Sequence, residues 1–477
     1  IEISLNSLGV DKLKRLTFTR YFHANGHYFS EPTWQSIIEN GDNKYDSYKK
    51  RKDPKYVTHG IHPYKGKFYP QLAKSLFNLG GVNAGDTILD PFCGSGTVLL
   101  ESYLNGYNSV GVDINPLAAK IARVKTNILS VDPYVRDRTL AKFAESMNKI
   151  SSSEKHLDGI YPNQVEALLG WVPVKVLSKL GWIIKEINQV ANIETQEFLE
   201  VVLSSIIRDV TQQDPKDLRI RRRKTPITDA PVKELFLNRL IEMRNRLLHY
   251  SKHSIYMPSN EISSDVFLGD IRNIETFTSN GVANNSVDLI VTSPPYATAL
   301  PYIDTDRLSI QLLFDLNSKQ RSTLEKTLIG NREINNSNKK DIEVLIESDD
   351  FSTIYSSTAR TLVRKIYKLN KNSNVGFRRK NTAALLYIYF RDMSQGIESM
   401  SKVIKKGGSI FLVIGENITR AGDDEKEIQI NTSKIIQEIG VTLGLKVNDV
   451  IPITVTQENR RHTKNSITQN DIIWLTA

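Results

Sequence analysis

The chain has 477 residues, of which 40% are hydrophobic, so it is long enough to bury a large core and to form more than one lobe. Its formal net charge of +10 favours a polyanionic partner, and no apolar run of about 18 residues or more is present to cross a membrane. A single cysteine excludes internal disulfides, and the eight histidines have no metal-ligand spacing, so we predict no metal site.

The first segment, residues 1–58, combines aromatic and basic side chains, and we predict an N-terminal arm there. A solvated arm is favoured slightly over one that contacts a polyanion. The basic segment His59-Gly-Ile-His-Pro-Tyr-Lys-Gly-Lys-Phe-Tyr-Pro70 follows, and apolar spacing then predicts an amphipathic helix over residues 71–78.

A strand, a glycine turn, a helix and a second strand follow one another between residues 86 and 113. The strands are predicted at 87–89 and 109–112, the turn at 92–96 and the helix at 97–104. Asp113 stands at the tip of the second strand, about 20 residues after the glycine turn, where an acid accepts hydrogen bonds from ribose hydroxyls. The series predicts a site for an adenosine-type ligand.

The region after the crossover helix expected at 117–127 is predicted to be helical. The expected helices cover 139–150, 164–169, 173–190, 195–210 and 232–250. The strongest charge run of the chain lies among them and comprises Arg219, Arg221, Arg222, Arg223 and Lys224. Such a run is either a solvated loop or a phosphate contact, and the two interpretations have equal weight.

A second pair of strands is predicted at 264–270 and 287–292. The latter ends in Ser293-Pro294-Pro295-Tyr296, and two prolines cannot continue a central strand or a helix. The chain must therefore leave the sheet at Ser293 in a stiff, extended loop. At the carboxyl edge of an open α/β sheet, such a loop holds a hydroxyl, a carbonyl and an aromatic face in the place where ligands bind.

The remaining chain is predicted to complete the sheet after a polar insertion. A helix is expected at 305–316, and residues 317–380 are polar, with a mobile loop at 335–340. The insertion ends in a second basic segment, Arg378, Arg379 and Lys380. Further helices are expected at 381–403, which stops at 405–408, and at 432–443, and further strands at 409–414, 446–453 and 471–475.

Two stretches together carry a resemblance to a known family. Asp90-Pro-Phe-Cys-Gly-Ser-Gly-Thr97, followed far downstream by Thr292-Ser-Pro-Pro-Tyr296, resembles the S-adenosylmethionine-dependent DNA amino-methyltransferases. The serine in Ser-Pro-Pro makes the chain most similar to the cytosine-N4-specific members. The resemblance implies a Rossmann-like class I methyltransferase fold, which is α/β with a mixed, mostly parallel seven-stranded sheet, and here with an inserted helical lobe.

The resemblance also implies how the chain is divided. The N-terminal arm is expected at 1–58, the cofactor half of the methyltransferase domain at 59–128, an inserted helical lobe that is a candidate for DNA binding at 129–260, and the catalytic half at 261–477, with its basic insertion at about 317–380.

The cofactor implied by the resemblance is S-adenosylmethionine. Asp270 is expected to accept from the adenine amino group while Ile271 packs on the ring, and the segment with Tyr64, Lys67 and Phe68 is expected to close over the methionine end. A surface carboxylate and a basic loop packed on the sheet are the structural alternatives. The remaining candidate cofactor residues are Asp90, Pro91, Phe92, Cys93, Gly94, Ser95, Gly96, Thr97, Asp113, Ile114 and Ser293.

The catalytic residues implied by the resemblance are Ser293, Pro294, Pro295 and Tyr296. The Ser293 hydroxyl and the Pro294 carbonyl would accept the two amino protons of an extruded base, Pro295 would stiffen the loop and Tyr296 would stack on the base. Cytosine C5 methylation needs a nucleophilic thiolate near the base, whereas Cys93 lies in the cofactor loop, so C5 chemistry is excluded.

The partner implied is duplex DNA in a prokaryotic cytoplasm, as part of restriction-modification or phage defence, with a cognate endonuclease as a possible companion. Both basic segments, 219–224 and 378–380, are candidate DNA contacts. Three alternatives stay open: an adenine-N6 methyltransferase, an RNA guanine methyltransferase, and a DNA-binding relative without activity. The recognition sequence cannot be inferred.

Overall fold

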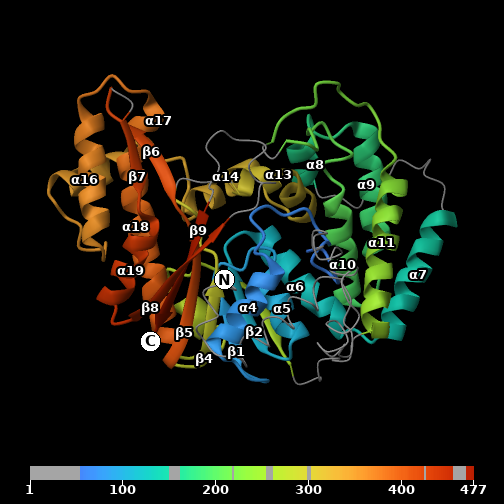
Figure 1. Cartoon of the computed structure of the whole chain (residues 1–477). Coiled ribbons are helices and arrows are strands. Elements are labelled where there is room, and N and C mark those ends of the chain that lie inside the picture. Colours follow the sequence, from blue (N-terminus) through green and yellow to red (C-terminus); the bar gives the residue numbers. More distant parts are fainter. Residues whose placement is uncertain are drawn as a thin grey trace, which may run out of the picture.

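The computed structural model describes residues 54–149, 162–217, 220–253, 262–297, 302–423, 426–454 and 469–477. Seven strands form its central sheet: β1 Thr87–Asp90, β2 Asn108–Asp113, β3 Ser264–Leu268, β4 Val287–Thr292, β5 Ile404–Gly415, β8 Lys446–Thr454 and β9 Gln469–Thr476. They lie in the order β3-β2-β1-β4-β5-β9-β8 (Figure 1). Pairs from β3 to β5 are parallel, and β9 is antiparallel to β5 and β8. The predicted Rossmann-like class I fold is confirmed.

Helices cover both faces of this sheet because its strands alternate their apolar side chains between two cores. On β4, Leu289 packs with Phe77 in one apolar cluster, whereas its neighbour Ile290 belongs to another cluster that contains Ile397 and Ile436. The first face is covered by α4 Pro70–Gly80 and α5 Thr97–Leu104, and the second by α18 Thr382–Val403 and α19 Thr432–Thr442.

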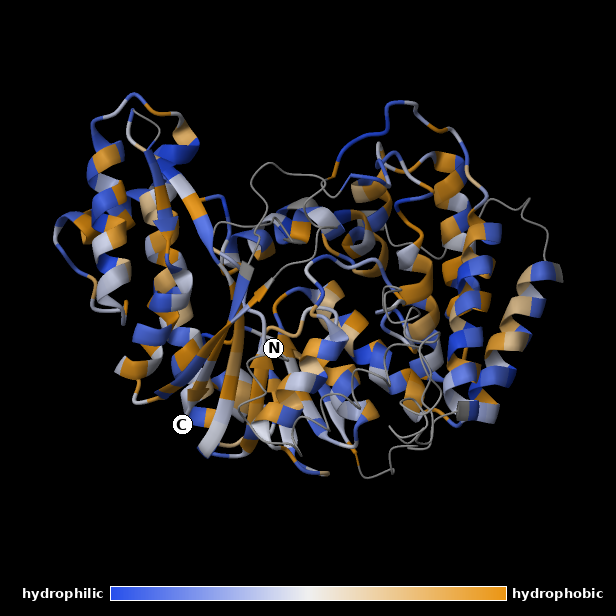
Figure 2. Ribbon diagram, in the orientation of Figure 1, coloured by the Kyte–Doolittle hydropathy of each residue, from blue (hydrophilic) through white to orange (hydrophobic). Residues whose placement is uncertain are grey.

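A group of helices packs beyond the β3 side of the sheet and is seen to the right in Figure 1. It comprises α6 Pro116–Ser130, α7 Pro133–Lys149, α8 Pro162–Leu168, α9 Val174–Ile187, α10 Ile193–Ser205, α11 Val232–His253 and α13 Tyr302–Leu313. Figure 2 shows the apolar residues of these helices in orange, and their buried side chains form one cluster. The cluster continues into α5 through Leu100 and Leu104. The helical character expected between 139 and 250 is confirmed, and its role as a separate DNA-binding lobe stays a prediction.

The insertion at 317–380 is more ordered than its polar composition suggests. It folds into α14 Ser318–Thr327, α15 Asn336–Glu347, α16 Ser357–Lys371 and α17 Phe377–Lys380. The prediction of a mobile loop at 335–340 is wrong, because the Asn335 side chain caps α15 by accepting from the Asn338 amide. Ile342 and Ile346 of this helix are buried in the same core as α18, and this burial secures the helix.

Three smaller features also differ from the sequence interpretation. Helix α18 ends at Val403 as expected, but β5 begins at Ile404 rather than at residue 409, so the predicted helix stop at 405–408 forms the irregular beginning of the strand. Two strands that the sequence did not predict, β6 Asn417–Ala421 and β7 Lys426–Ile430, form an antiparallel pair outside the main sheet. The short helix α12 Glu275–Thr278 follows β3 and was not predicted either.

Two further statements hold for the described part of the chain. None of its helices is long and apolar enough to cross a membrane. It also contains no group of three or more His, Cys, Asp or Glu side chains with a geometry suited to a metal ion. The arm expected at 1–58 falls almost entirely outside the described residues.

Candidate active site

The glycine turn between β1 and α5 has a backbone that only glycine allows. Gly96 precedes the helix with a φ of 72°, and a Cβ on it would lie 2.6 Å from the Cα of Ala122. Gly94 has a φ of 48°, and a Cβ there would lie 3.4 Å from Cε1 of Tyr64. The turn therefore packs closely on α6 behind it and has the Tyr64 ring on its other side. The role expected for Tyr64 at the methionine end of the cofactor stays a prediction.

Asp113, at the end of β2, is tied to this turn. Its carboxylate accepts from the Gly94 amide at 2.8 Å and from the Asn115 amide at 2.8 Å. Burial raises the pKa of Asp113 to about 6, although these backbone donors oppose the shift. Three backbone amides, those of Gly94, Ile114 and Asn115, bond a carboxylate that has about four acceptor positions, so Asp113 can still accept a hydroxyl donor from a ribose.

The tip of β3 joins the same edge of the sheet. The Gly269 amide donates to the Asp113 carbonyl at 3.1 Å, and this bond brings the following residue, Asp270, beside β2. The next side chain, Ile271, is buried and lies in the same apolar cluster as the half-buried Phe92 of the glycine turn. The residues predicted around an adenosine-type ligand are thus drawn together from the ends of three neighbouring strands.

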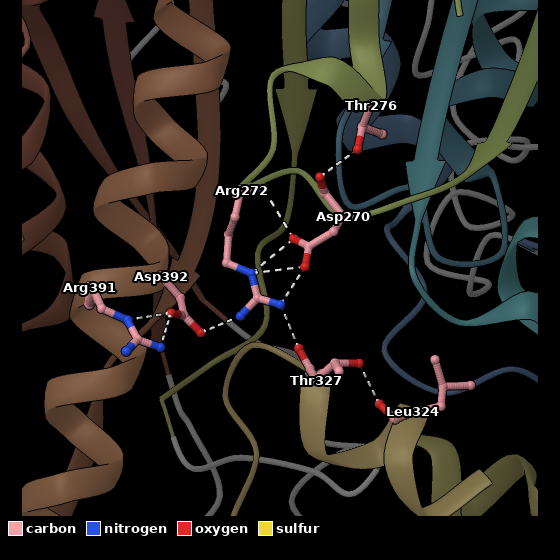
Figure 3. Close-up of polar contacts among 7 residues, drawn as sticks. All are labelled: Asp270, Arg272, Thr276, Leu324, Thr327, Arg391 and Asp392. Atoms are coloured by element: carbon pink, nitrogen blue, oxygen red, sulfur yellow. Dashed lines mark hydrogen bonds and ion pairs between the residues drawn. The ribbon is translucent and has the colours of Figure 1, made fainter. Parts of the chain in front are cut away.

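The Asp270 carboxylate is paired with an arginine, and the sequence analysis did not predict this pair. Figure 3 shows that the Arg272 guanidinium forks onto its carboxylate, with Nε 2.9 Å from Oδ1 and 3.0 Å from Oδ2. The same guanidinium donates to the Asp392 carboxylate of α18 at 2.6 Å and to the Thr327 carbonyl of α14 at 2.9 Å. Arg391 completes the chain of charges by donating to Asp392 at 2.9 Å. Sequence reasoning missed Arg272 and Asp392 altogether.

The catalytic loop predicted after β4 leaves the same edge and is joined to the cofactor turn. Thr292, the last residue of β4, donates from Oγ1 to the Asp90 carboxylate of β1 at 2.6 Å. Burial raises the pKa of Asp90 to about 7, and the hydrogen bond from Thr292 works against that shift. Ser293 is therefore one residue away from a direct bond to the strand that carries the glycine turn.

The loop itself is held by groups from other elements. The Ser293 hydroxyl donates to the Val413 carbonyl of β5 at 3.0 Å, and the Tyr389 hydroxyl of α18 donates to the Pro295 carbonyl at 3.0 Å. Asn417 donates to the Ala297 carbonyl at 2.7 Å. Since two prolines remove two amide donors from this loop, these external bonds replace the backbone bonds that fix an ordinary turn.

Tyr296 is largely buried in this loop. Burial raises the pKa of its phenol, so the side chain stays neutral at physiological pH. Its carbonyl is approached closely by Gly330, on which a Cβ would lie 2.8 Å away. Gly330 thus packs against the backbone at the far end of the loop that the sequence predicted as catalytic.

Lys67, a predicted cofactor residue, is bonded within its own segment. Much of its side chain is exposed, but its ammonium donates to the His59 carbonyl at 3.0 Å and to the His62 carbonyl at 2.6 Å. These two hydrogen bonds stabilise the segment that carries Lys67. Another lysine that the sequence did not single out, Lys125, is fully buried and reaches Ser95 of the glycine turn at 3.4 Å. The only feature of the sequence that marks Lys125 is its place, as a cation, on the face of the crossover helix that was expected to be buried.

The two basic segments lie in different parts of the molecule. Arg219 lies outside the described residues. Arg221 pairs with Asp217 at 3.3 Å, Arg222 lies over the Trp171 ring at 4.6 Å, and Arg223 donates to backbone carbonyls of residues 208–213. On α17, by contrast, Arg378 and Lys380 are exposed and Phe377 is 70% exposed.

Comparison with known proteins supports the predicted resemblance. Residues 61–153 match the UPF0020 family, described as an RMKL-like methyltransferase domain. The type II methyltransferase M.BsoBI of Geobacillus stearothermophilus is 25% identical, over 79% of this chain and 77% of that protein. M.MvaI of Kocuria varians is also 25% identical, over 81% of each chain.

A shorter match lies in a different kind of enzyme. A tRNA (guanine(10)-N2)-dimethyltransferase of Methanothermobacter thermautotrophicus is 54% identical, but over 52 residues, which are 11% of this chain and 16% of that protein. Among solved structures, the rRNA methyltransferase AviRa of Streptomyces viridochromogenes matches with a TM-score of 0.31 and 9% identity over 87% of both chains, a likeness too weak to support any conclusion.

The glycine turn with its close backbone, the strand-tip carboxylates and the order of the strands all suit an S-adenosylmethionine site. The matches over most of the chain are to type II methyltransferases. The chain is therefore a class I methyltransferase that takes its methyl group from S-adenosylmethionine, and it is related to the type II methyltransferases.

Proposed function

We infer that this methyltransferase acts at a specific site in duplex DNA and methylates the exocyclic N4 of cytosine. The observation that carries the transfer to an exocyclic amine is the hydrogen bond from the Ser293 hydroxyl to the Val413 carbonyl, while the choice of cytosine rests on the serine itself. A hydroxyl whose proton is committed to a carbonyl offers only lone pairs to any other group. Ser293 is therefore suited to accept a proton from an amino group, and it is unsuited to donate.

The neighbouring carbonyls support the same role. Among the described residues, none is recorded as a donor to the Pro294 carbonyl, whereas the Pro295 carbonyl is taken by Tyr389. Ser293 and Pro294 together offer two acceptors to the two protons of an amine. The lone pair of this amine is delocalised into the base ring, and the two hydrogen bonds favour the pyramidal nitrogen that has a lone pair free to attack. Tyr296 supplies the ring on which an extruded base stacks.

The residues that would hold the cofactor lie next to this loop. When bound, S-adenosylmethionine supplies an electrophilic methyl group on a sulfonium. The 91–97 turn and Asp113 would bind its ribose and methionine parts, and Asp270 and Ile271 would bind its adenine. Asp90 joins this turn to Thr292 by a direct bond. That bond fixes the distance between the cofactor turn and the catalytic loop, and such positioning supplies most of the rate in a direct transfer.

DNA as the substrate is supported by the relatives and by charge. The relatives that match most of the chain are named type II methyltransferases, and the chain carries a net charge of +10. A role in restriction-modification in a prokaryotic cytoplasm, beside a cognate endonuclease, follows from that kinship. The division into a cofactor half, a helical lobe and a catalytic half belongs to the same proposal.

An RNA guanine methyltransferase is the second candidate function, because the tRNA methyltransferase match is 54% identical over its 52 residues. Its short extent favours a shared cofactor motif over a shared substrate. Adenine-N6 methylation uses the same acceptor pair, and only the serine at position 293 favours cytosine. A relative without activity would not be expected to keep the Ser293 and Thr292 bonds together.

Mass analysis of nucleosides tests the proposal. DNA and RNA are each incubated with the protein and S-adenosylmethionine and digested, and N4-methylcytosine from DNA is the expected product. N6-methyladenine alone would establish the adenine alternative, and a methylguanosine from RNA alone would establish the RNA alternative. No methylated nucleoside from either nucleic acid would contradict the assignment of an active enzyme.

Ser293→Ala tests the acceptor role within that assay. It should slow methyl transfer about 10²-fold while leaving cofactor affinity unchanged, because an orienting acceptor at the reacting nitrogen is lost. Ser348→Ala is a matched control, since that exposed hydroxyl bonds only within its own helix. Equal rates for Ser293→Ala and the wild type would remove the serine from the mechanism.

A further inference from the structure

We propose that helix α18 is a positioning element that sets the catalytic loop and the adenine-binding acid at the same time. Tyr389, Asp392 and Gly396 would do this from one face of the helix. The inference rests on the proposed roles of the Ser293 loop and Asp270. It adds residues that lie outside both motifs and that act on the reaction only through other groups.

The first link is from the helix to the catalytic loop. Tyr389 is 1% exposed, and its hydroxyl donates to the Pro295 carbonyl at 3.0 Å. Pro294 and Pro295 have no amide protons, so this part of the loop cannot be fixed by amide bonds of its own. The phenol fixes the peptide next to the proposed acceptor carbonyl of Pro294.

The second link is from the helix to the end of β3. Asp392 is 1% exposed and accepts from Arg272 at 2.6 Å and from Arg391 at 2.9 Å, so this buried carboxylate is matched by two guanidinium groups. Arg272 carries the contact on to both oxygens of Asp270 (Figure 3). A planar fork of this kind sets the orientation of a carboxylate as well as its charge.

Asp270 keeps acceptor capacity in this arrangement. An ionised carboxylate has about four acceptor positions, and the Arg272 amide and guanidinium occupy most of them. The Nε proton is shared between Oδ1 and Oδ2, and Nη2 also donates to Oδ2, so three donors serve about four positions and a single amino donor would take the place that Nε shares on Oδ2. Arg272 thus fixes the orientation of the Asp270 carboxylate, which a bare strand-tip aspartate would achieve only with a loss of side-chain freedom on binding.

The third link is a close approach of the Ile271 side chain to the backbone of α18. A Cβ on Gly396 would lie 2.6 Å from Cδ1 of Ile271, so α18 comes as near to the residue after Asp270 as a glycine allows. The positions 389, 392 and 396 are spaced by three and four, which places them on one face over two turns of a helix. A rigid helix of 22 residues therefore relates the two sites to each other.

Calorimetry and single-turnover kinetics on the full chain test the two ends separately. Arg272→Gln should weaken S-adenosylmethionine binding about tenfold while changing the rate at saturating cofactor less than about threefold, and Arg272→Lys should recover part of the affinity because it keeps the charge without the fork. Arg244→Lys is a matched control, because that guanidinium forks onto Asp137 in the helical part of the molecule.

The other end is tested by Tyr389→Phe. It should lower the single-turnover rate constant about tenfold or more with unchanged cofactor affinity. Tyr387→Phe is the control, since Tyr387 is equally buried on the same helix and donates to the Asp350 carbonyl at 2.9 Å, away from the loop. A structural role alone would make the two variants equally stable and equally active.

The outcomes separate this inference from the proposed function. Cofactor binding needs no nucleic acid, so unchanged affinity in a folded Arg272→Gln variant overturns the inference whatever the substrate proves to be. Equal rates for the two tyrosine variants, on whichever nucleic acid the wild type methylates, overturn it as well. A wild type that binds the cofactor and methylates neither DNA nor RNA contradicts the proposed function, while the affinity of Arg272→Gln still decides the inference.

Discussion

Two basic segments of similar sequence differ in what their cations contact. In residues 221–224, Arg223 donates to four backbone carbonyls of its own lobe, at 2.5–3.1 Å, and Arg222 bonds the Gly170 carbonyl at 2.7 Å while lying over Trp171. On α17, Arg378 and Lys380 contact no acidic or carbonyl group in the described part of the chain. The first segment holds a loop in shape, and the second faces solvent.

The difference shows that charge density along a sequence does not measure charge available to a partner. Of the four cations at 221–224, the three arginines interact with other groups that the structure describes, and Lys224 is the one cation left available to a partner. On the shorter segment, Arg378 and Lys380 are exposed, and α17 also presents the exposed ring of Phe377. The two segments lie on opposite sides of the central sheet, with α17 among α16, β6 and β7 (Figure 1). We therefore expect α17 to be the stronger DNA contact.

The largest effect is expected from Arg223→Ala, and it concerns stability. The substitution removes a half-buried guanidinium that satisfies four carbonyls, so the free energy of unfolding should fall by about 2–3 kcal/mol, in the range of hydrogen bonds to charged groups. Chemical denaturation measures this change, with Lys224→Ala as the control. If Arg223→Ala left stability unchanged and weakened DNA binding, Arg223 would be a DNA contact rather than a support of its own loop.

A smaller effect, on DNA binding, is expected from the double substitution Arg378→Gln and Lys380→Gln. If both cations meet phosphates, the slope of log K against log salt should fall by about 2, and affinity should fall about tenfold for all sequences alike. Fluorescence anisotropy over a range of salt concentrations measures both quantities. An unchanged slope would show that α17 is solvated surface. Loss of sequence preference would instead show that α17 belongs to the surface that recognises the DNA sequence.

The smallest effect is expected from Lys224→Gln. It removes the one cation of its segment that has no recorded partner among the described residues, so the salt slope should change by at most about 1 and stability should stay the same. The same anisotropy series measures it. A change in slope as large as that of the α17 double variant would indicate that DNA contacts both basic segments.

The sequence predicted the centre of the molecule better than its surroundings, and the reason is physical. Positive φ at Gly96 and the two prolines after Ser293 are constraints carried by single residues, so a local pattern reveals them. The Arg272–Asp392 pair joins residues 120 positions apart, and no local signal marks either partner.

The errors outside the centre have the same origin. The asparagine-rich stretch at 335–340 has the composition of a loop, yet one of its asparagines caps a helix whose apolar side chains are buried against α18. The β6–β7 pair escaped prediction because its strands are five residues each and alternate only in part. In both places tertiary packing outweighs composition.

The position of β4 has a consequence for how the chain is made. It lies between β1 and β5 in the sheet, and Asp288 meets Thr87 across 201 positions of sequence. Until the ribosome has released β4, the growing chain shows the unpaired edge of β1 to its surroundings, while the helices of the intervening region are already complete. A fragment that stops short of residue 287 should keep that open edge and tend to self-associate, so the two motifs of the active site come together only late in synthesis, when the sheet closes.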